Sequence, residues 1–550
     1  MRKPPLAGLL LGSLALLTAC LGSAPPTAPL PANAPTAIPP AAATAGGDAF
    51  SIIAGSEQKS ILDTVVVPWC QKQGYTCTYT LKGSVDQALL LQSGAVPYDA
   101  MWFASTVFWQ LGDTQSRLKY VKPMFSSPVV FAGWKSVMQR LGFVGREVKV
   151  ADILQAAESG QTHIWMTNPS QSNSGATAYL AFLNRFAGNG PGQALTLDQL
   201  NSSPVQDQIT RLMGTVERTS PSSGDLMRSC VAQPDRCQAL FTYEALVIET
   251  NQQQAQAGKE PLYAVYPSDG TSIADSPLGF VPHDNAQKEQ IFQQLQAYLL
   301  SDTGVQQIRA LGRRAGTIGL TIPNADKAVF NPDWGIDATR VIQPITYPDA
   351  NVIRTALTLY QTSFRRPVHA IYCLDGSGSM GDNDGWNELV QGSEIIFDQT
   401  KAAPYYLQGH PGDLTSVLIF NSDVAAGPWT VTGNNAGQMR TLYENIKNHA
   451  PDDGTNLYTC LNRALDLFAQ SKGETRKRLI IVMTDGQSDT DGSDTFKQRL
   501  AAAGNIPVIS IAFGSDADKS QLQDLADVSG GIVVGQTDLV AALREATGYK

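Results

Sequence analysis

The last third of the chain alternates short apolar runs with amphipathic stretches, and this alternation constrains the fold more than any other feature. The apolar runs cover residues 368–374, 415–420, 478–484, 507–513 and 531–535. The stretches between them have the spacing of amphipathic helices, at residues 387–400, 436–448, 457–470, 494–503, 518–527 and 537–546. Strands that are apolar along their whole length are typical of parallel sheets buried on both faces. The pattern therefore predicts a doubly wound α/β domain over residues 366–550.

A second region of alternating strands and helices precedes it, over residues 48–365. Its strand and helix signals occupy residues 50–62, 76–84, 98–105, 127–134 and 163–186, followed by helical stretches at 292–316 and 349–366. A chain of 550 residues is too long for one hydrophobic core, and 43% apolar residues are enough to fill more than one. We therefore expect a second folded α/β domain here.

The N-terminus has the pattern of an export signal over residues 1–19. Two basic residues are followed by about a dozen apolar ones, which is too short for a membrane-spanning helix. The end of this segment, Leu17 to Cys20, resembles the lipobox of bacterial lipoproteins, which implies that Cys20 becomes the acylated first residue. The alternative is an ordinary secretory signal with a chance cysteine. The resemblance implies an exported protein held at the cell membrane or cell surface by a lipid anchor.

Residues 20–47 follow as a linker of almost only Pro, Ala, Thr and Gly, with no charged residue. Such a composition cannot bury apolar surface and favours an extended spacer. We expect it to hold the folded part away from the membrane.

The charge balance excludes some partners. The 40 Lys and Arg residues include Arg2 and Lys3 of the export signal, so the mature chain has 38 of them against 49 Asp and Glu, a net charge near −11. Nucleic acid is therefore not expected as a partner, because binding its backbone needs a basic surface.

Six cysteines remain besides Cys20, and four of them recur at one spacing. Cys70 with Cys77 and Cys230 with Cys237 each enclose six residues, and an exported chain meets an oxidising compartment, so two local disulfides are predicted. The last two cysteines are Cys373 and Cys460. They lie in apolar runs and are expected as buried free thiols, although a bond between them stays open.

Serine-bearing turns stand where strands are predicted to end and helices to begin, at Ser56, Ser84 and Ser174. Free backbone N–H groups at helix starts, together with hydroxyls, suit an anion or another polar ligand. For each serine the alternative is a helix N-cap and nothing more.

This region resembles bacterial extracellular solute-binding proteins of the two-lobed, molybdate- or sulfate-like type. The resemblance lies in the order of its predicted elements and in its local sequence, including "TNPSQSNSGATAYLAFL" (167–183) and "LLSDTGVQQI" (299–308). The resemblance implies a two-lobed, periplasmic-binding-protein-like domain over residues 48–365. It also implies a cleft for a small solute, and Ser56, Ser84 and Ser174 are the polar contacts we expect there.

Three loops of the last domain bring oxygen donors to one edge of the predicted sheet. "DGSGSM" follows the first strand, "MTDG" ends a later one, and "DGTNLY" opens a helix between them. Ligands bind beyond the carboxyl ends of strands in such sheets. Two carboxylates and three hydroxyls suit a hard divalent cation. The donors are Asp375, Ser377, Ser379, Thr455 and Asp485.

These loops resemble the metal-ion-dependent adhesion site of von Willebrand factor type A domains, which have a Rossmann-like, doubly wound fold. By motif match, the resemblance implies direct binding of the ion by Ser377, Ser379 and Thr455, with Asp375 and Asp485 often acting through water. One coordination position is left for a carboxylate of a protein partner. Mg²⁺ is expected first, with Mn²⁺ and Ca²⁺ as alternatives, since all three accept oxygen ligands.

Enzyme motifs do not fit these loops. Neither Ser377 nor Ser379 has the flanks of a Gly-x-Ser-x-Gly nucleophile, and neither a Gly-Lys-Ser/Thr phosphate loop nor His-Glu-x-x-His is present. We expect a binding protein and not an enzyme, with a hydrolase as the least favoured alternative.

Two functions stay open: a cell-surface protein that binds a protein partner through a metal ion, and the substrate-binding component of an ABC-type importer that captures a small solute or oxyanion.

Overall fold

The computed structural model describes residues 49–549 apart from residues 318, 383–384, 472–474, 486–487, 505, 513–518 and 536–538. The described residues belong to one compact unit. The predicted export signal, Cys20 and the linker lie outside them. Within the described part of the chain, no helix has the length and apolar character that crossing a bilayer requires.

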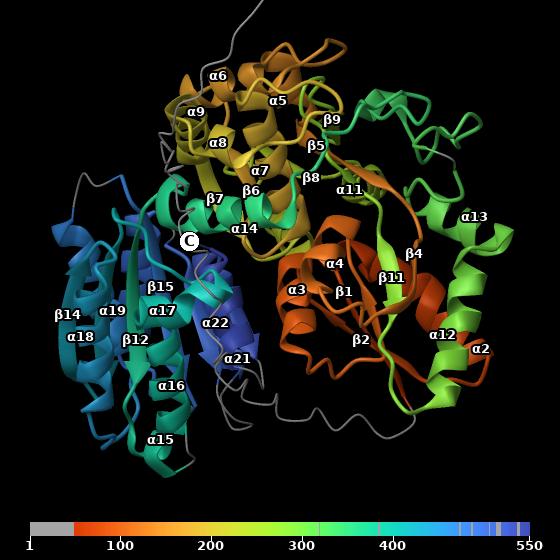
Figure 1. The fold of residues 1–550 in the computed structure, drawn as a ribbon. Coiled ribbons are helices and arrows are strands. Elements are labelled where there is room, and N and C mark those ends of the chain that lie inside the picture. Colours follow the sequence, from red (N-terminus) through yellow and green to blue (C-terminus); the bar gives the residue numbers. More distant parts are fainter. Residues whose placement is uncertain are drawn as a thin grey trace, which may run out of the picture. The chain divides into compact units, whose positions relative to one another are not determined.

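The first lobe is built on a five-stranded sheet (Figure 1). Strands β1 to β3 are parallel, whereas β11 runs antiparallel to both β3 and β4. In sheet order the strands are β2 (Cys77–Leu81), β1 (Phe50–Ala54), β3 (Ala100–Trp102), β11 (Pro277–Phe280) and β4 (Lys119–Pro123). The associated helices are η1 (Ser56–Gln58), α1 (Lys59–Ile61), η2 (Leu62–Val66), α2 (Val67–Lys72), α3 (Ser84–Ser93), α4 (Thr106–Gly112), α12 (Ala286–Leu299) and α13 (Asp302–Ala310).

The second lobe has a six-stranded mixed sheet. Its strands are β10 (Ile273–Ala274), β5 (Ser127–Trp134), β8 (Ala239–Tyr243), β6 (Ile164–Thr167) and β7 (Val216–Ser220), with β9 (Leu262–Val265) paired to β5. Its helices are α5 (Lys135–Arg140), α6 (Val150–Glu158), α7 (Asn173–Phe186), α8 (Leu197–Leu200), α9 (Ser203–Gly214), α10 (Ser223–Ala232), α11 (Glu244–Gln256), η3 (Pro332–Trp334), α14 (Ala350–Leu359) and η4 (Tyr360–Phe364). The chain crosses between the two lobes from β4 to β5 and again from β10 to β11. Residues of both crossings line the pocket described below.

The last part of the chain forms a third sheet of six strands. In sheet order they are β14 (Val424–Thr432), β13 (Leu414–Phe420), β12 (Val368–Asp375), β15 (Lys477–Thr484), β16 (Val508–Ala512) and β17 (Ile532–Gly535). The helices are α15 (Gly378–Asp382), α16 (Gly385–Phe397), α17 (Gln399–Ala402), η5 (Ala403–Tyr405), α18 (Ala436–Lys447), α19 (Leu457–Gln470), α20 (Ser493–Ala503), α21 (Lys519–Ser529) and α22 (Leu539–Thr547).

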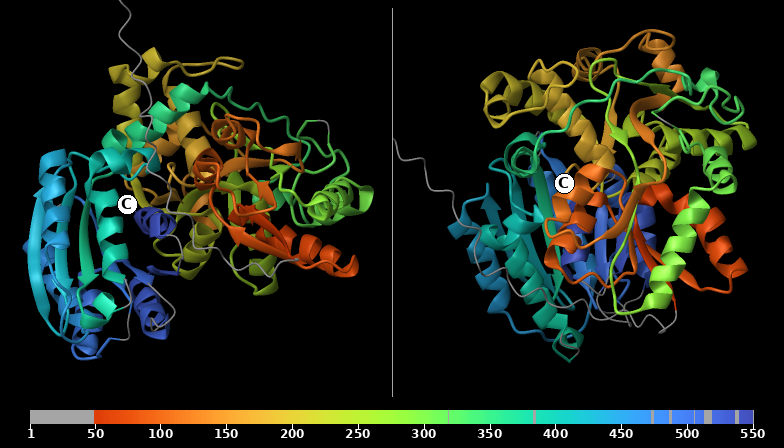
Figure 2. Two further views of the ribbon diagram at one scale, coloured as in Figure 1. Left: turned by 60° about the horizontal axis from the view of Figure 1, so that its bottom comes forward. Right: turned by 45° about the vertical axis from the view of Figure 1, so that its right-hand side comes forward.

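Strand β12 lies inside this third sheet and is buried along its whole length. Side chains alternate across a strand, so Tyr372 and Leu374 pack into one core and Ile371 and Cys373 into another. Helices cover both faces of the sheet (Figure 2). The predicted doubly wound fold is confirmed, and every strand predicted for this domain from its apolar run is present.

The edge strand β14 was missing from the prediction. It pairs antiparallel with β13 and is largely half-exposed, so it lacks the continuous apolar run of its neighbours. It also contains Gly427 and Pro428, joined by a cis peptide bond, and Pro is normally confined to sheet edges. The sheet is therefore parallel except at this edge.

All six described cysteines are paired. Cys70 bonds Cys77 and Cys230 bonds Cys237, as predicted. The expectation of free thiols at Cys373 and Cys460 is wrong, because these residues form a third disulfide. The packing of α19 against β12 brings them together across 87 positions of sequence, which local spacing cannot show.

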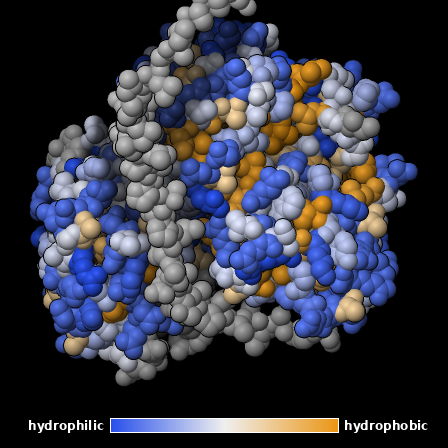
Figure 3. Space-filling model, viewed as in Figure 1, coloured by the Kyte–Doolittle hydropathy of each residue, from blue (hydrophilic) through white to orange (hydrophobic). Residues whose placement is uncertain are grey.

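Most of the molecular face in Figure 3 is hydrophilic, with apolar residues in separate groups. This distribution is ordinary for a folded protein, since polar groups never cover the whole surface.

Candidate functional site

The first two metal-site loops are neighbours because their strands are neighbours. β12 and β15 run parallel, with Leu374 paired to Met483 just before each strand ends. Asp375 ends β12 and Asp485 follows β15 directly. Both carboxylates therefore lie at the same edge of the sheet, 110 residues apart in sequence.

Four of the five predicted donors are linked by hydrogen bonds. The Asp375 Oδ1 atom accepts a hydrogen bond from the backbone N–H of Ser377, 2.9 Å away. The Ser377 and Ser379 hydroxyls lie 3.1 Å apart, and the Ser379 hydroxyl donates to Asp485 Oδ1 over 3.0 Å. Asp375 Oδ2 accepts from the Thr484 hydroxyl, so the side chains form one polar cluster.

The third loop lies against the first through backbone contacts. The Gly378 N–H donates to the Asp453 carbonyl over 3.0 Å, and the Asp452 N–H donates to the Gly376 carbonyl over 3.0 Å. A Cβ on Gly376 would lie 2.5 Å from the Ile419 side chain on β13, so glycine at this position lets the first loop lie close to that strand.

The structure places Thr455 in that third loop, half-buried. Its carbonyl accepts from the Asp489 N–H over 2.8 Å, which ties the loop to the segment after β15. Among the described residues, its hydroxyl makes no hydrogen bond to the other four donors. The Thr455 loop therefore lies at this edge, and the hydroxyl's role as a ligand stays a prediction.

Both carboxylates of the cluster are buried, and one of their oxygen atoms has no hydrogen-bond partner among the described residues. Burial raises the pKa of Asp375, and the negative charge of Asp485 adds to this, against hydrogen bonds from Thr484 and Ser377. The Asp485 Oδ2 atom is buried and has no hydrogen-bond partner in the described part of the chain. A buried acceptor without a partner is costly, and a cation would satisfy it.

The donor set is unlike a transition-metal site. The described residues include no group of three or more His, Cys, Asp or Glu side chains able to hold a metal ion. Two carboxylates with hydroxyls instead form an all-oxygen set, which Mg²⁺, Mn²⁺ and Ca²⁺ accept.

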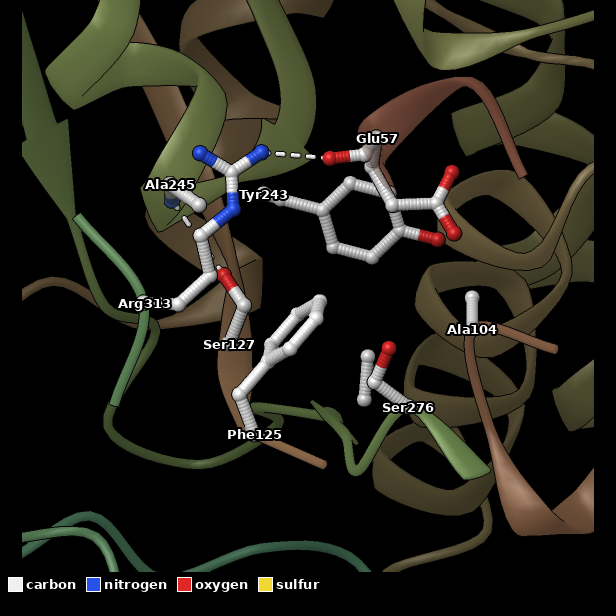
Figure 4. Close-up of a pocket in the computed structure, with 9 residues that line it drawn as sticks. Glu57, Ala104, Phe125, Ser127, Tyr243, Ala245, Ser276 and Arg313 are labelled. Carbon is white, nitrogen blue, oxygen red and sulfur yellow. Dashed lines mark hydrogen bonds between the residues drawn. The ribbon is translucent and has the colours of Figure 1, made fainter. Parts of the chain in front are cut away.

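A second candidate site lies between the two lobes (Figure 4). This interlobe pocket is closed in the structure and leaves no space for a water molecule. It is lined by Glu57, Ala104, Phe125, Ser127, Tyr243, Ala245, Ala274, Ser276 and Arg313. In Figure 4 the side-chain carboxyl of Glu57 lies beside the Tyr243 ring. The Arg313 guanidinium donates a hydrogen bond to the backbone carbonyl of Glu57.

Two charged groups of this pocket were not predicted from the sequence. Burial raises the pKa of Glu57 to about 7, against the opposing effect of the Arg313 charge. Arg313 is fully buried and pairs with Glu249. Glu57 could have been recognised as a candidate pocket residue from its position in the sequence, in the strand-to-helix turn directly after the first strand.

The three serines predicted for the cleft are engaged with protein groups. The Ser84 hydroxyl accepts from the Ala104 N–H over 3.0 Å, and the Ser174 hydroxyl lies 2.8 Å from that of Thr167. Ser56 contacts the other lobe, because its hydroxyl accepts from the Gly224 N–H over 2.9 Å. None of the three is among the residues lining the interlobe pocket, and their role toward a solute stays a prediction.

The C-terminal helix α22 contacts both lobes near these turns. Arg544 pairs with Asp86 of the first lobe and donates to the Ser170 carbonyl of the second over 2.7 Å. Glu545 pairs with Lys82 over 3.1 Å. The end of the chain therefore joins the two lobes to the third sheet.

Residues 50–314 match the family model described as bacterial extracellular solute-binding protein, and residues 398–534 match the model described as von Willebrand factor type A domain. The chain carries a solute-binding domain followed by a von Willebrand factor type A (VWA) domain. The range matched to the VWA domain includes Thr455 and Asp485 and begins after Asp375.

Solved structures are similar to each part. The sulfate-binding protein of Mycobacterium tuberculosis is 17% identical over 53% of this chain and 93% of its own, with a TM-score of 0.36. An ABC transporter solute-binding protein from Thermotoga lettingae, bound with alpha-D-tagatose, is 15% identical over 48% of this chain and 80% of its own, with a TM-score of 0.35. A von Willebrand factor type A protein from Catenulispora acidiphila is 18% identical over 34% of this chain and 43% of its own, with a TM-score of 0.28. No curated protein matches the chain.

Proposed function

We propose that the protein binds a protein partner through a divalent cation held in its VWA domain. The observation that supports this most is the cluster of Asp375, Ser377, Ser379 and Asp485, in which the buried Asp485 Oδ2 atom has no hydrogen-bond partner among the described residues. These four residues, with Thr455 from the adjacent loop, would hold the cation. When bound, the ion supplies a positive charge that attracts a carboxylate of the partner.

The protein's own residues prepare this site. The Thr484 hydroxyl and the Ser377 N–H both donate to Asp375 and fix its carboxylate in place. Ser379 connects the first loop to Asp485. The all-oxygen donor set suits a hard divalent cation, with Mg²⁺ as the first choice and Mn²⁺ or Ca²⁺ as the alternatives.

Partner binding can be tested with the full chain immobilised and cell-surface extract passed over it. The proposal expects retention of a partner with Mg²⁺, release by EDTA, and no retention by Asp375→Ala or Ser379→Ala. Arg440→Ala, a change on the exposed side of α18, is the matched control and should retain the partner. Retention that EDTA and both site variants leave unchanged would refute the metal-dependent mechanism.

The solute-binding domain supports a second candidate function, capture of a small solute between the lobes. The supporting observation is that the interlobe pocket has charged groups, Glu57 and Arg313, at its wall. In this view the domain is either a second recognition unit or the substrate-binding component of an ABC-type importer. Calorimetric titration of the full chain with a solute panel tests it, and binding that Glu57→Gln abolishes would support it.

The cellular location belongs to the same proposal. A protein that captures partners or solutes outside the cell would be exported and held at the membrane by acylated Cys20. Metabolic labelling with a fatty acid, compared between the native chain and Cys20→Ala, tests this. Equal labelling of both proteins would contradict the lipid anchor.

A further inference from the structure

We propose that helix α22, together with Gly548 and Tyr549 after it, is a clasp that holds the two lobes closed, and that the lobes open only when this clasp is released. The clasp acts on the movement of the lobes. It requires neither a bound metal ion nor a solute, so it is independent of both candidate functions above.

The two lobes contact each other directly at two places. In the first contact, the Ser56 hydroxyl of the first lobe lies 3.1 Å from the Ser223 hydroxyl of the second and accepts from the Gly224 N–H over 2.9 Å. In the second contact, the Val85 N–H of the first lobe donates to the Gln171 carbonyl of the second over 3.2 Å. The lobes are therefore closed, in keeping with a pocket between them that leaves no space for a water molecule.

The second of these contacts is close enough to require a glycine. A Cβ on Gly83 would lie 2.2 Å from the Gln171 carbonyl oxygen. The backbone angles of Gly83, φ −60° and ψ 153°, are open to any residue, so the close approach and not the conformation explains the glycine. Opening of the lobes would have to break this contact.

The clasp binds the second-lobe side of both contacts. At one of them, the Gln171 side-chain amide donates to the Arg544 carbonyl. At the other, the Tyr549 hydroxyl donates to Asp225 Oδ2 over 2.8 Å, one residue after Gly224 in α10. Both segments of the second lobe that touch the first lobe are therefore bound by the clasp.

The clasp also binds the first lobe. The Arg544 guanidinium pairs with Asp86 of α3 in the first lobe and donates to the Ser170 carbonyl of the second over 2.7 Å. Glu545 adds an ion pair to Lys82 of the first lobe over 3.1 Å. Separation of the lobes would take one of its two partners away from Arg544, which is almost fully buried, and a buried charge without its partner is costly.

The other face of α22 belongs to the core of the VWA domain. Ala542, Leu543 and Ala546 pack into the core that also contains Leu374 of β12. The clasp is therefore part of the VWA domain, and this domain holds the lobes together. Closure of two-lobed proteins is usually stabilised by a ligand between the lobes; here the end of the chain itself supplies bonds to both lobes.

Residue-level hydrogen exchange of the full chain tests the clasp at the Val85 and Gly224 N–H groups. Each is the second residue of its helix and has no carbonyl partner within that helix, so the bond across the lobes protects it. In Arg544→Met we expect both groups to exchange at least about tenfold faster, with exchange in the core strand β5 unchanged. The control Arg440→Met, on the exposed side of α18, should leave both groups unchanged.

Tyr549→Phe is the second variant, in case Arg544→Met folds poorly. It removes only the hydroxyl that bonds Asp225, so the aromatic ring can keep its place in the core. We expect faster exchange at Gly224, because the start of α10 loses its bond to the clasp. Exchange at the native rate in both variants would overturn the proposal.

A disulfide lock separates lobe opening from local loosening. The Ser56 and Ser223 hydroxyl oxygens are 3.1 Å apart, so the pair Ser56→Cys and Ser223→Cys should form a disulfide on oxidation while the lobes are closed. This lock, added to Arg544→Met, should return the exchange at Val85 to the native rate. Fast exchange that the lock does not slow would refute the clasp, as would failure of the pair to bond in an otherwise native chain.

Discussion

Cys373 and Cys460 form a disulfide that joins β12 to α19, with their Cα atoms 5.9 Å apart. Asp375 follows Cys373 by two residues, and the loop with Thr455 leads into α19. The bond therefore ties together two of the loops that form the candidate metal site.

Replacing both cysteines by alanine should destabilise the VWA domain and weaken metal binding. A loop of 87 residues predicts a loss of about 4–5 kcal/mol in the free energy of unfolding on chain-entropy grounds. Denaturant unfolding of the full chain measures this loss. The control is removal of Cys230 and Cys237, whose loop of 7 residues predicts a smaller loss of about 2 kcal/mol and no change in metal affinity. Equal metal affinity in both variants would contradict the positioning role.

Glu57 should make stability depend on pH. Its pKa rises from 4.5 to about 7 on folding, so the folded protein keeps a proton that the unfolded chain releases. The stabilisation is therefore fully present below about pH 4.5 and is lost as the pH rises through about 7, by up to about 3 kcal/mol. Urea unfolding of the native chain and Glu57→Gln at pH 4.5, 6 and 8 measures it. A difference between the two proteins that stays constant over this range would show that the Glu57 pKa is not raised.

Arg544→Met should release α22 from the two lobes. The side chain is almost fully buried and pairs with Asp86, and its removal leaves that carboxylate without its cation. We expect a loss of about 2–4 kcal/mol. Hydrogen exchange should become faster in α22 and in the loop around Ser170. The pair of the exposed Arg440 with the half-buried Asp398 provides the control, since Arg440→Met should change stability by less than about 1 kcal/mol. Unchanged exchange in both segments would show that the contact does not hold them.

The sequence predicted those parts of the fold that depend on local pattern. The run 127–134 corresponds residue for residue to β5, and the apolar runs of the last domain located five of its six strands, all except β14. Asp375 and Asp485 lie at one edge because the parallel neighbours β12 and β15 end together, and their role as ligands stays a prediction.

What the sequence did not predict depends on contacts between distant residues. Local spacing does not show that Cys373 meets Cys460 across 87 positions. Nor does it show how the buried Gln58 amide is oriented, because its Nε2 atom donates to the Phe103 carbonyl, 45 residues away in sequence. The edge strand β14 was missed because it is only half-buried and has no continuous apolar run.

The central claim is that a divalent cation binds at the ends of β12 and β15. The most direct test is titration of the full chain with Mn²⁺, in which electron paramagnetic resonance measures the free ion. We predict one bound Mn²⁺ per chain, displaced by Mg²⁺, with affinity reduced at least a hundredfold in Asp485→Ala and unchanged in the exposed variant Glu388→Gln. Equal Mn²⁺ binding by the native chain and Asp485→Ala, or no binding by either, would contradict the account.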